Sequence, residues 1–310
     1  MSRNSQYFVH KELLSMKAVE TIKYYEQNHA EEIANSINNT ILYDFQGKEN
    51  ELEYLNSREL KAKEHYVILK SKTTVGTIES VAKRNGKVSE RFGKIAVLNF
   101  ASYKHPGGMF LKGSSAQEES LCHNSDLYPI LNGYNNITGY YTENKSRLNH
   151  GFYEHRALYT PDVLFCINGK KYFVNVITCA APNIGSKSAI EYEKEHPGTN
   201  EKILRERLLL IRHICAENKI DTLITGPFGC GVFKQDPRVV APYSKDIFDT
   251  PGTELKNVIY SLPQEHGSFA YNSIVFVGTF AEYIAKQFGL VEGQSEEVVP
   301  GWSLSVSDEC

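Results

Sequence analysis

Three short apolar segments of this sequence each run directly into a loop rich in small residues. The segments are residues 95–100, 172–178 and 222–225, and the loops after them contain Pro106-Gly-Gly, Cys179-Ala-Ala-Pro and Gly226-Pro-Phe-Gly-Cys-Gly. Short apolar runs that end in turn residues are typical of buried strands. Before the third segment, residues 201–218 alternate apolar and charged residues with the period of an amphipathic helix. Strands alternating with helices predict an α/β fold in which ligands bind beyond the carboxyl ends of the strands.

The remaining sequence adds further helices and strands around this centre. We expect amphipathic helices over residues 11–39, a strand over 66–69, a helix over 77–84, a last strand over 273–277 and a last helix over 280–288. These elements leave room for one main domain rather than two equal ones.

The length of 310 residues and the hydrophobic content of 41% are enough to bury a full core. We expect three parts, which are an N-terminal helical extension (residues 1–64), a main α/β domain (residues 65–290) and a flexible acidic tail (residues 291–310). No internal repeat or low-complexity linker separates them.

Composition and charge exclude several classes of protein. The net charge of -3 gives no basic surface for nucleic acid or an anionic membrane. No segment reaches the ~18–20 apolar residues of a membrane helix, and the first residues lack a signal peptide's apolar core. We therefore expect a cytoplasmic protein, with the nucleus or delivery into a host cell left open. The 6 cysteines are widely spaced without a Cys-x-x-Cys pair, which predicts reduced thiols and no metal site.

The segment from residue 98 to residue 120 carries the most chemistry. Gly107 and Gly108 let the backbone approach a ligand closely, and two adjacent carboxylates follow at Glu118 and Glu119. If Gln117 opens a helix, these carboxylates lie near its unpaired N–H groups, and one of them can turn into a pocket. The alternative is a solvated pair in the first turn, because Glu side chains are mostly exposed.

Three ordered blocks of residues carry a family resemblance. They are Asn99-Phe-Ala-Ser with Pro106-Gly-Gly-Met and Gln117-Glu-Glu, then Val176-Ile-Thr-Cys-Ala-Ala-Pro-Asn, then Gly226-Pro-Phe-Gly-Cys-Gly-Val-Phe. Together they resemble the bacterial-type poly(ADP-ribose) glycohydrolases, whose pattern is a run of glycines, a short spacer and Gln-Glu-Glu. The resemblance implies that residues 65–290 form a macrodomain-like glycohydrolase domain, a three-layer α/β/α sandwich with a mixed central sheet that follows the N-terminal helical extension. One residue departs from the pattern, because Met109 replaces the third glycine and its side chain could narrow the pocket.

The same resemblance implies hydrolysis of the O-glycosidic bond of poly- or mono-ADP-ribosylated proteins, with release of ADP-ribose. Glu119 would be the catalytic acid and base, and Glu118 would accept hydrogen bonds from ribose hydroxyls. A carboxyl group whose pKa is raised by an apolar site can give a proton and then take one from water. Two chain neighbours cannot flank a sugar at the ~5–9.5 Å separations of glycosidase pairs, so we expect a one-acid mechanism. The expected substrate-binding residues are Asn99, Gly107, Gly108, Gln117, Gly229, Cys230, Gly231, Val232 and Phe233.

The implied substrate is an anion, although the chain is acidic and its glycine loops contain few cations. Backbone N–H groups around Gly229 and Gly231 are suited to hold a diphosphate as a nest. Asp236 would then cap a new helix with Pro237 at its first position, and Phe233 would cover the distal ribose. We expect no metal, no cofactor, no partner besides ADP-ribose or poly(ADP-ribose) on modified proteins, and a monomer.

Two other functions stay open. A non-catalytic macrodomain reader would bind ADP-ribose without hydrolysis, which Met109 favours and the intact Gln-Glu-Glu disfavours. A hydrolase of a free ADP-ribose derivative would use the same nest with a different reacting centre. A Cys230 nucleophile with His105 or His123 as base is disfavoured, because no Cys-His-Asn pattern accompanies it. The linkage, to ribose, a carboxylate, Ser or Arg, is also left open.

Overall fold

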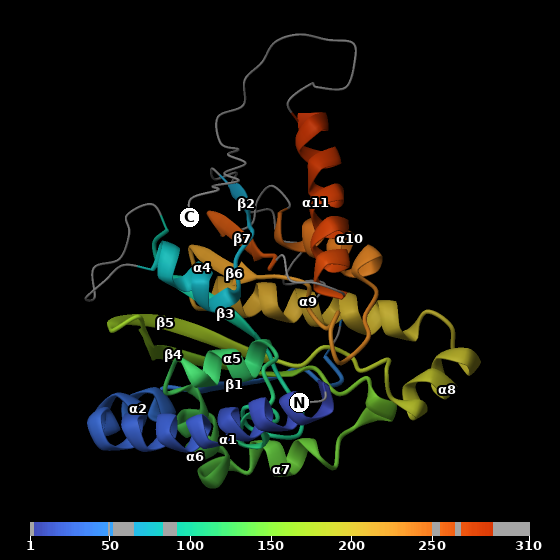
Figure 1. The fold of residues 1–310 in the computed structure, drawn as a ribbon. Helices are drawn as coiled ribbons and strands as arrows, with labels where there is room; N and C mark the ends of the chain where they lie inside the picture. The colour runs from blue at the N-terminus through green and yellow to red at the C-terminus, as the bar shows by residue number, and fades with distance from the viewer. Residues whose placement is uncertain are drawn as a thin grey trace.

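The computed structural model describes residues 3–48, 50–51, 65–82, 92–249, 255–263 and 268–287. Within these residues the chain forms a seven-stranded sheet with helices on both sides (Figure 1). The tail predicted for residues 291–310 lies outside the described residues.

The sheet is mixed, with strand order β1-β4-β5-β3-β6-β7-β2. Strands β5, β3, β6, β7 and β2 are parallel, whereas β4 is antiparallel to both β1 and β5. The strands are β1 (Ile41–Asp44), β2 (Tyr66–Lys70), β3 (Ile95–Phe100), β4 (Arg156–Ile167), β5 (Lys170–Cys179), β6 (Thr222–Thr225) and β7 (Asn257–Ser261). The described helices are α1 (Arg3–Asn28), α2 (Ala30–Asn38), α4 (Thr74–Val81), α5 (Gln117–His123), α6 (Leu127–Thr138), α7 (Tyr140–Asn144), α8 (Lys187–Glu195), α9 (Thr199–Glu217), α10 (Pro237–Phe248) and α11 (Ser268–Gln287), with 3-10 turns η2 (Phe110–Lys112) and η3 (Asn149–Gly151).

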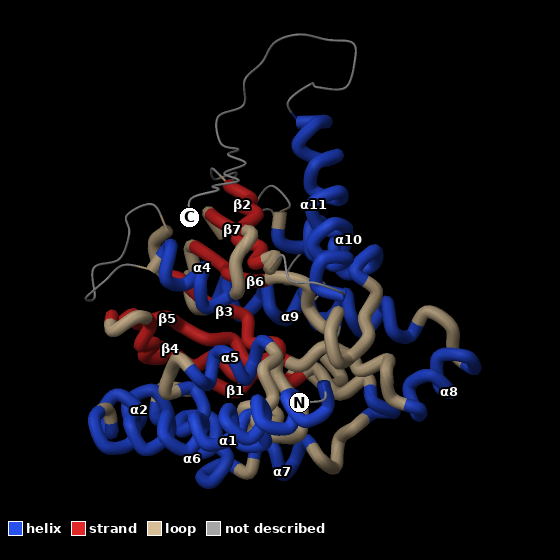
Figure 2. Tube along the Cα trace, in the orientation of Figure 1, coloured by secondary structure: helices blue, strands red, loops and turns tan. Residues whose placement is uncertain are grey.

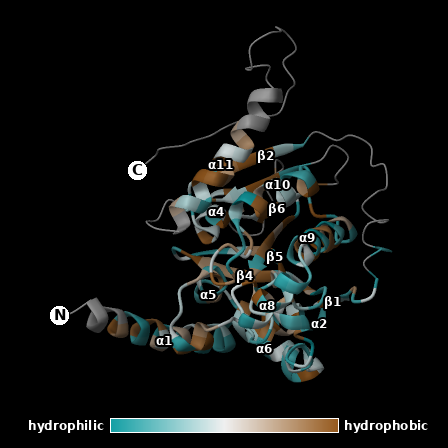
Figure 3. Ribbon diagram, turned by 90° about the vertical axis from the view of Figure 1, so that its right-hand side faces the viewer, coloured by the Kyte–Doolittle hydropathy of each residue, from teal (hydrophilic) through white to brown (hydrophobic). Residues whose placement is uncertain are grey.

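Helices cover both faces of the sheet, so the fold is the three-layer α/β/α sandwich that the resemblance implies. Successive side chains of β3 enter opposite cores: Val97 packs with α1, α4, α5 and α6, and Leu98 packs with α9, α10 and α11. Figure 2 shows the red strands enclosed between blue helices on the two sides. In Figure 3, helix α9 carries both hydrophobic and hydrophilic residues, as expected of a helix that covers a sheet.

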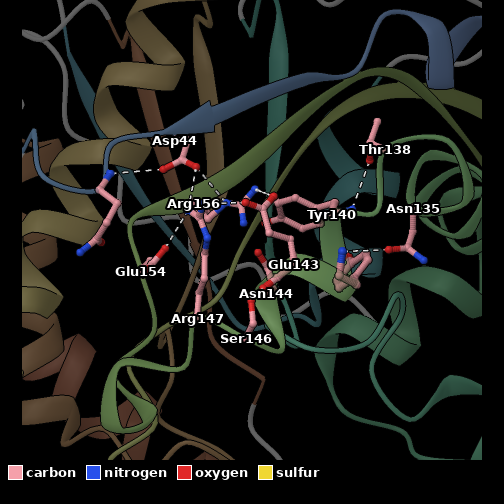
Figure 4. Close-up of polar contacts among 12 residues, drawn as sticks. Asp44, Asn135, Thr138, Tyr140, Glu143, Asn144, Ser146, Arg147, Glu154 and Arg156 are labelled. Carbon is pink, nitrogen blue, oxygen red and sulfur yellow. Dashed lines mark hydrogen bonds and ion pairs between the residues drawn. The ribbon is translucent and has the colours of Figure 1, made fainter.

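The N-terminal helices pack directly against the helices near the sheet. The hydroxyl of Tyr25 in α1 donates to the Asn124 carbonyl at 3.0 Å and accepts from the Cys166 N–H at 3.1 Å. After α2 the chain adds β1 to the edge of the sheet, where Asp44 forms ion pairs with Arg156 and Arg147 (Figure 4). The sequence pattern did not predict β1 or β4. The boundary proposed near residue 64 stays a prediction.

The prediction of a strand over residues 273–277 is wrong. These residues lie inside α11, and the last described strand is β7. Phe276 and Phe280, one helical turn apart, are buried against Tyr260, whereas Ile274 is 69% exposed. A run of four apolar residues is compatible with either a strand or one turn of a buried helix, and only the packing distinguishes them. None of the helices in the described part of the chain combines the length and apolar character needed to cross a membrane.

Candidate active site

The polar side chains that follow β3 are tied to the first turn of α5. Gln117 accepts from the Phe100 N–H at 2.9 Å and donates to the Leu98 carbonyl at 2.9 Å, so its amide pairs with the end of β3 as a neighbouring strand would. Its amide nitrogen also donates to the Thr74 hydroxyl of α4 at 3.3 Å. The prediction that Gln117 opens a helix is confirmed, with Ala116 at the N-cap. These bonds fix the position of the next two residues, the glutamates.

Glu118 is a buried carboxyl group held by donors from the β3 end. It is 4% exposed and accepts from the Asn99 amide at 3.2 Å and from the Ser102 N–H at 2.7 Å. Burial raises its pKa to about 8, and the Glu119 carboxylate adds to this rise, whereas the bonds from Ser102 and Asn99 act in the opposite direction. Below about pH 8 the protonated form of this carboxyl group therefore predominates.

Glu119 is equally buried but less completely hydrogen-bonded. It is 5% exposed, and its Oε1 accepts from the Met109 N–H at 2.9 Å. Its Oε2 receives no hydrogen bond from any residue that the structure describes. One carboxylate oxygen is thus fixed by the loop while the other is left for a different partner.

Asn99 supplies a second polar atom without a partner. Its side chain is fully buried, and its amide nitrogen donates to Glu118 and, at 3.4 Å, to the Thr178 hydroxyl. The side-chain oxygen is buried and accepts from none of the described residues. Buried polar atoms are nearly always hydrogen-bonded, so this oxygen is suited to accept from a hydroxyl group of a bound ligand.

The two glycines of the loop are required by contacts with the carboxylates and the core. Gly108 has φ +60°, and a Cβ there would lie 2.6 Å from Glu119 Oε1 and 2.8 Å from Glu118 Oε2. Gly107 has φ +62°, and its Cβ would lie 2.8 Å from the Tyr128 ring. Side chains are excluded at both positions by backbone conformation and by space.

Met109 differs from these glycines. It is the N-cap of η2, with φ -107° and ψ 27°, and this negative φ does not require a glycine. Its side chain is 43% exposed and is not among the residues that line the cavity described below. The expectation that Met109 narrows a pocket therefore finds no support in this cavity.

The loop after β6 forms a tight turn with several unpaired N–H groups. Gly229 has φ +76°, and a Cβ there would lie 2.7 Å from Ala181 Cβ. The turn is closed by bonds from Cys230 N–H to the Pro227 carbonyl at 3.1 Å and from Gln235 N–H to the Gly229 carbonyl at 3.1 Å. The N–H groups of Gly229, Gly231, Val232 and Phe233 have no acceptor among the described residues. Successive free N–H groups of this kind bind anions.

A cavity of about 310 Å³ lies between this loop and α5. Its lining residues come from the ends of β3, β5 and β7 and the residues just after them, the start of α4, the segment 115–120, the β6–α10 loop and α11. Gln117 and Ser120 line it from α5, while Glu118 and Glu119 do not. The cavity is within the size range of small-ligand pockets and adjoins the carboxylates without containing them.

Aromatic ring contacts link Phe233 of the β6–α10 loop, through Tyr153, to Tyr103 of the loop after β3. The Phe233 ring meets the Tyr153 ring at a centroid distance of 5.8 Å, and Tyr153 stacks on Tyr103 at 4.4 Å. The expected helix start after this loop is confirmed, because Asp236 accepts from the Arg238 N–H at 2.9 Å and Pro237 begins α10. The Phe233 ring also lines the cavity.

The alternative of a thiol nucleophile is not supported by the structure. Cys230 is 7% exposed, and burial raises the pKa of its thiol, so the thiolate is disfavoured. His123 packs edge-on against Phe110, with burial lowering its pKa to about 4. Among the described residues no group of three or more His, Cys, Asp or Glu side chains could hold a metal ion.

Two supporting residues were missed by the sequence reasoning. Ser102 donates its N–H to Glu118, a backbone role that no sequence pattern signals. Arg207 of α9 is fully buried and donates to the Ala180 carbonyl, and to the Tyr153 carbonyl at 3.3 Å. On the sequence it is one more charged residue of an amphipathic helix.

Comparison with known proteins places this geometry in a family. Residues 14–167 match the family model for the catalytic domain of microbial-type PARG, the poly(ADP-ribose) glycohydrolases, and the match begins inside α1. The Deinococcus radiodurans enzyme solved with ADP-ribose is 25% identical, with a TM-score of 0.69 over 81% of this chain and 98% of that one. The Thermomonospora curvata enzyme is 23% identical, with a TM-score of 0.71 over 87% of this chain and 100% of that one. A search of curated proteins gave no match. The chain belongs to the microbial-type poly(ADP-ribose) glycohydrolase family.

Proposed function

We propose that this protein is an ADP-ribosyl glycohydrolase that hydrolyses the O-glycosidic bond of poly- or mono-ADP-ribosylated proteins and releases ADP-ribose. The family match and the solved relatives, one with ADP-ribose and one with the inhibitor ADP-HPD, support this function. The observation that carries it is the buried Glu119, with one oxygen fixed by the Met109 N–H and the other unpaired among the described residues. A reader module would not need such a group.

Different parts of the site would bind the diphosphate, the nucleoside and the distal ribose of one ADP-ribose unit. The free N–H groups of Gly231, Val232 and Phe233 would bind the diphosphate, because no Lys or Arg is among the residues that line the cavity beside them. The cavity beside α5 and α11 would hold the nucleoside end. The distal ribose would then lie towards the carboxylates, where the unpaired Asn99 oxygen can accept from a ribose hydroxyl.

The reaction needs one proton donor. Protonated Glu119 would give its proton to the leaving oxygen as the bond from that oxygen to the anomeric carbon breaks. The resulting carboxylate would take a proton from the attacking water, whose oxygen bonds to the same carbon. Glu118 and Glu119 both approach Gly108 from the same turn of α5, at 2.8 and 2.6 Å from its ideal Cβ position. They cannot flank the sugar from opposite faces, so a one-acid mechanism fits this geometry.

Substitution of Glu119 tests this function. Wild type and Glu119→Gln are incubated with poly- and mono-ADP-ribosylated protein, and released ADP-ribose is measured. We expect E119Q to lose ~10²–10⁴-fold in rate while it still binds ADP-ribose in calorimetry. An inactive wild type that binds ADP-ribose would indicate a reader, and an active E119Q would remove Glu119 from the mechanism. The monomeric state, the lack of nucleic-acid or membrane binding and the cytoplasmic location stay predictions.

A further inference from the structure

The loop between β3 and α5 is basic in a chain that is acidic overall. Residues 101–116 contain Lys104, His105 and Lys112 and no acidic residue, although the whole chain has 37 acidic and 34 basic residues. All three of these side chains are exposed. No cavity-lining residue comes from positions 101–114, so this basic surface lies outside the cavity proposed for the bound nucleoside.

Hydrogen bonds connect the turn that carries Lys104 and His105, here called the basic turn, to the catalytic carboxylates. Ser102 donates its N–H to Glu118, and its hydroxyl oxygen accepts from the N–H groups of Lys104 at 3.3 Å and His105 at 3.2 Å. The His105 carbonyl accepts from Gly108 N–H at 3.1 Å, and Gly108 abuts both carboxylates. The turn that carries Lys104 and His105 is therefore fixed between Glu118 and Gly108.

A third lysine joins this turn from α7. The Asn144 amide donates to the Tyr103 carbonyl at 2.9 Å, which places Lys145, the next residue after Asn144, near Lys104. Burial and then the charges of Lys145, Lys104 and Lys112 lower the pKa of His105, as expected if the three ammonium groups surround it.

Acidic neighbours do not neutralise these lysines. Glu143 already pairs with Arg147 at 2.7 Å and with Arg156 at 2.8 Å (Figure 4). Lys104, Lys112 and Lys145 form no ion pair with any residue in the described part of the chain. An unneutralised cluster of ammonium groups attracts anions such as phosphates.

We propose that Lys104, Lys112 and Lys145 bind the diphosphate of the nucleotide on the leaving side of the scissile bond, that is, the next ADP-ribose unit of a polymer. This inference rests on the proposed function, because the leaving group of a poly(ADP-ribose) chain carries its own diphosphate next to the bond that Glu119 would cleave. The site would then distinguish a polymer from a single ADP-ribose on a protein. The β6–α10 loop holds the diphosphate of the released unit, and the basic turn holds that of the remaining chain.

Neutral variants test the inference by binding. Lys104→Gln/Lys145→Gln is made in the E119Q background, and its affinity is measured for ADP-ribose and for labelled poly(ADP-ribose) chains of defined length with a free ADP-ribose end. We expect a loss of about tenfold for the chains, the effect of two exposed charge contacts, and no change for ADP-ribose. The loss should shrink as salt is raised.

The matched control removes two exposed lysines that lie at the amino ends of the parallel strands, on the side of the sheet opposite to the catalytic loop between β3 and α5. Lys171 lies at the start of β5 and Lys219 just before β6, whereas the catalytic loop follows the end of the parallel strand β3. Lys171→Gln/Lys219→Gln makes the same change in net charge and should leave both affinities unchanged. Equal losses in the two double variants would show a general charge effect and overturn the inference.

The remaining outcomes separate this inference from the proposed function. Three results would overturn the subsite alone. The lysine variant could bind the chains as tightly as E119Q does, or it could lose as much affinity for ADP-ribose as for the chains. E119Q itself could also bind the chains no more tightly than ADP-ribose. If wild type is inactive but binds chains in a lysine-dependent way, the subsite stands and the catalytic proposal fails. If E119Q binds neither ligand, both fail. In the wild-type background, an equal fall in hydrolysis of mono-ADP-ribosylated protein would indicate recognition of the protein instead and overturn the subsite.

Discussion

The loops after β3 and after β6 follow neighbouring parallel strands and both contain glycines with positive φ, but they use their N–H groups in opposite ways. After β3, the N–H groups of Phe100, Ser102 and Met109 donate to the protein's own Gln117, Glu118 and Glu119. After β6, the N–H groups of Gly231, Val232 and Phe233 donate to no described residue. The first loop fixes carboxyl groups, and the second keeps its donors for an anion from outside.

Because of this difference, the glycines of the two loops have different structural roles. The sequence suggested that both loops bring the backbone close to substrate. In the structure, Gly108 approaches the catalytic carboxylates, whereas Gly229 is forced by its contact with Ala181 and so shapes the turn that presents the free donors. Substitutions in the first loop should therefore affect the chemical step, and substitutions in the second should affect binding.

Among substitutions of the loop residues outside Glu118 and Glu119, the largest effect is expected for Gly108→Ala. The new Cβ would collide with both glutamates at 2.8 Å or less, and the φ of +60° adds strain of about 1–2 kcal/mol. Because displacement of a reacting group by about 1 Å can cost ~100-fold in rate, we expect kcat to fall by about that factor. Steady-state hydrolysis of ADP-ribosylated protein measures it. Gly169→Ala is the control, because Gly169 has φ +71° and nothing within 4 Å; an equal fall in both variants would mean that strain alone is responsible.

A smaller effect, and on a different constant, is expected for Gly229→Ala. Its Cβ would lie 2.7 Å from Ala181 and 2.8 Å from the Gln235 side chain, so the turn must move and its free N–H groups with it. Loss of one or two hydrogen bonds to the diphosphate should raise the Kd for ADP-ribose about tenfold, with kcat little changed. Calorimetry and steady-state kinetics separate the two constants. Gly198→Ala, at φ +88° with open space around it, is the control. A fall in kcat with unchanged Kd would contradict the division between the loops.

Local signals in the sequence predicted the parts of both loops that depend on local structure. The runs that form β3 and β6 are followed by glycine-rich segments, and the sequence indicates where α5 and α10 begin, at Gln117 and at Asp236-Pro237. These signals reflect backbone conformation and the burial of neighbouring residues, which are encoded within a few positions. The family resemblance added the identity of the carboxyl groups.

Features that depend on distant contacts were not predictable. Strand β1 is only four residues long and is defined by its pairing with β4, more than 100 positions later. The buried Arg207 and the free Asn99 oxygen depend on which carbonyls and donors lie around them in space. The apolar run of residues 273–277 predicts a strand by pattern alone, but the helix α11 that it forms is defined by packing against Tyr260, which the run does not reveal.

The protonation of Glu118 gives a prediction on stability. Its pKa is raised from 4.5 to about 8, so between these pH values the folded protein holds a proton that the unfolded chain releases. The associated stability is fully present below about pH 4.5 and is lost as the pH rises to about 8. Glu118→Gln cannot titrate, so its free energy of unfolding relative to wild type should rise across this window, by roughly 1–4 kcal/mol.

Urea unfolding at several pH values measures this difference. In an E119Q background the difference should be smaller, because the Glu119 carboxylate contributes to the raised pKa of Glu118. If the free energies of unfolding of wild type and E118Q differ by a constant amount from pH 4.5 to 8, Glu118 is ionised in the folded protein over this whole range. The loop after β3 would then bind two negatively charged carboxylates through the N–H groups of Ser102 and Met109. The two loops would differ in that the first already holds its negative charges, whereas the second has free N–H groups for the charges of a ligand.

The smallest effect is expected for Met109→Gly, which restores the third glycine of the family pattern. Met109 has φ -107°, so no strain is relieved, and what Glu119 accepts at 2.9 Å is a backbone N–H that glycine also has. We expect kcat and Kd for ADP-ribose to change less than about twofold, with a stability loss of about 0.5–1 kcal/mol from added backbone freedom. Kinetics on polymer and on mono-ADP-ribosylated protein, with thermal unfolding alongside, measure both. A rise of tenfold or more on polymer alone would instead show that the exposed methionine obstructs the leaving chain. The third position of this loop would then control the length of substrate accepted, while the N–H of the same residue holds the acid.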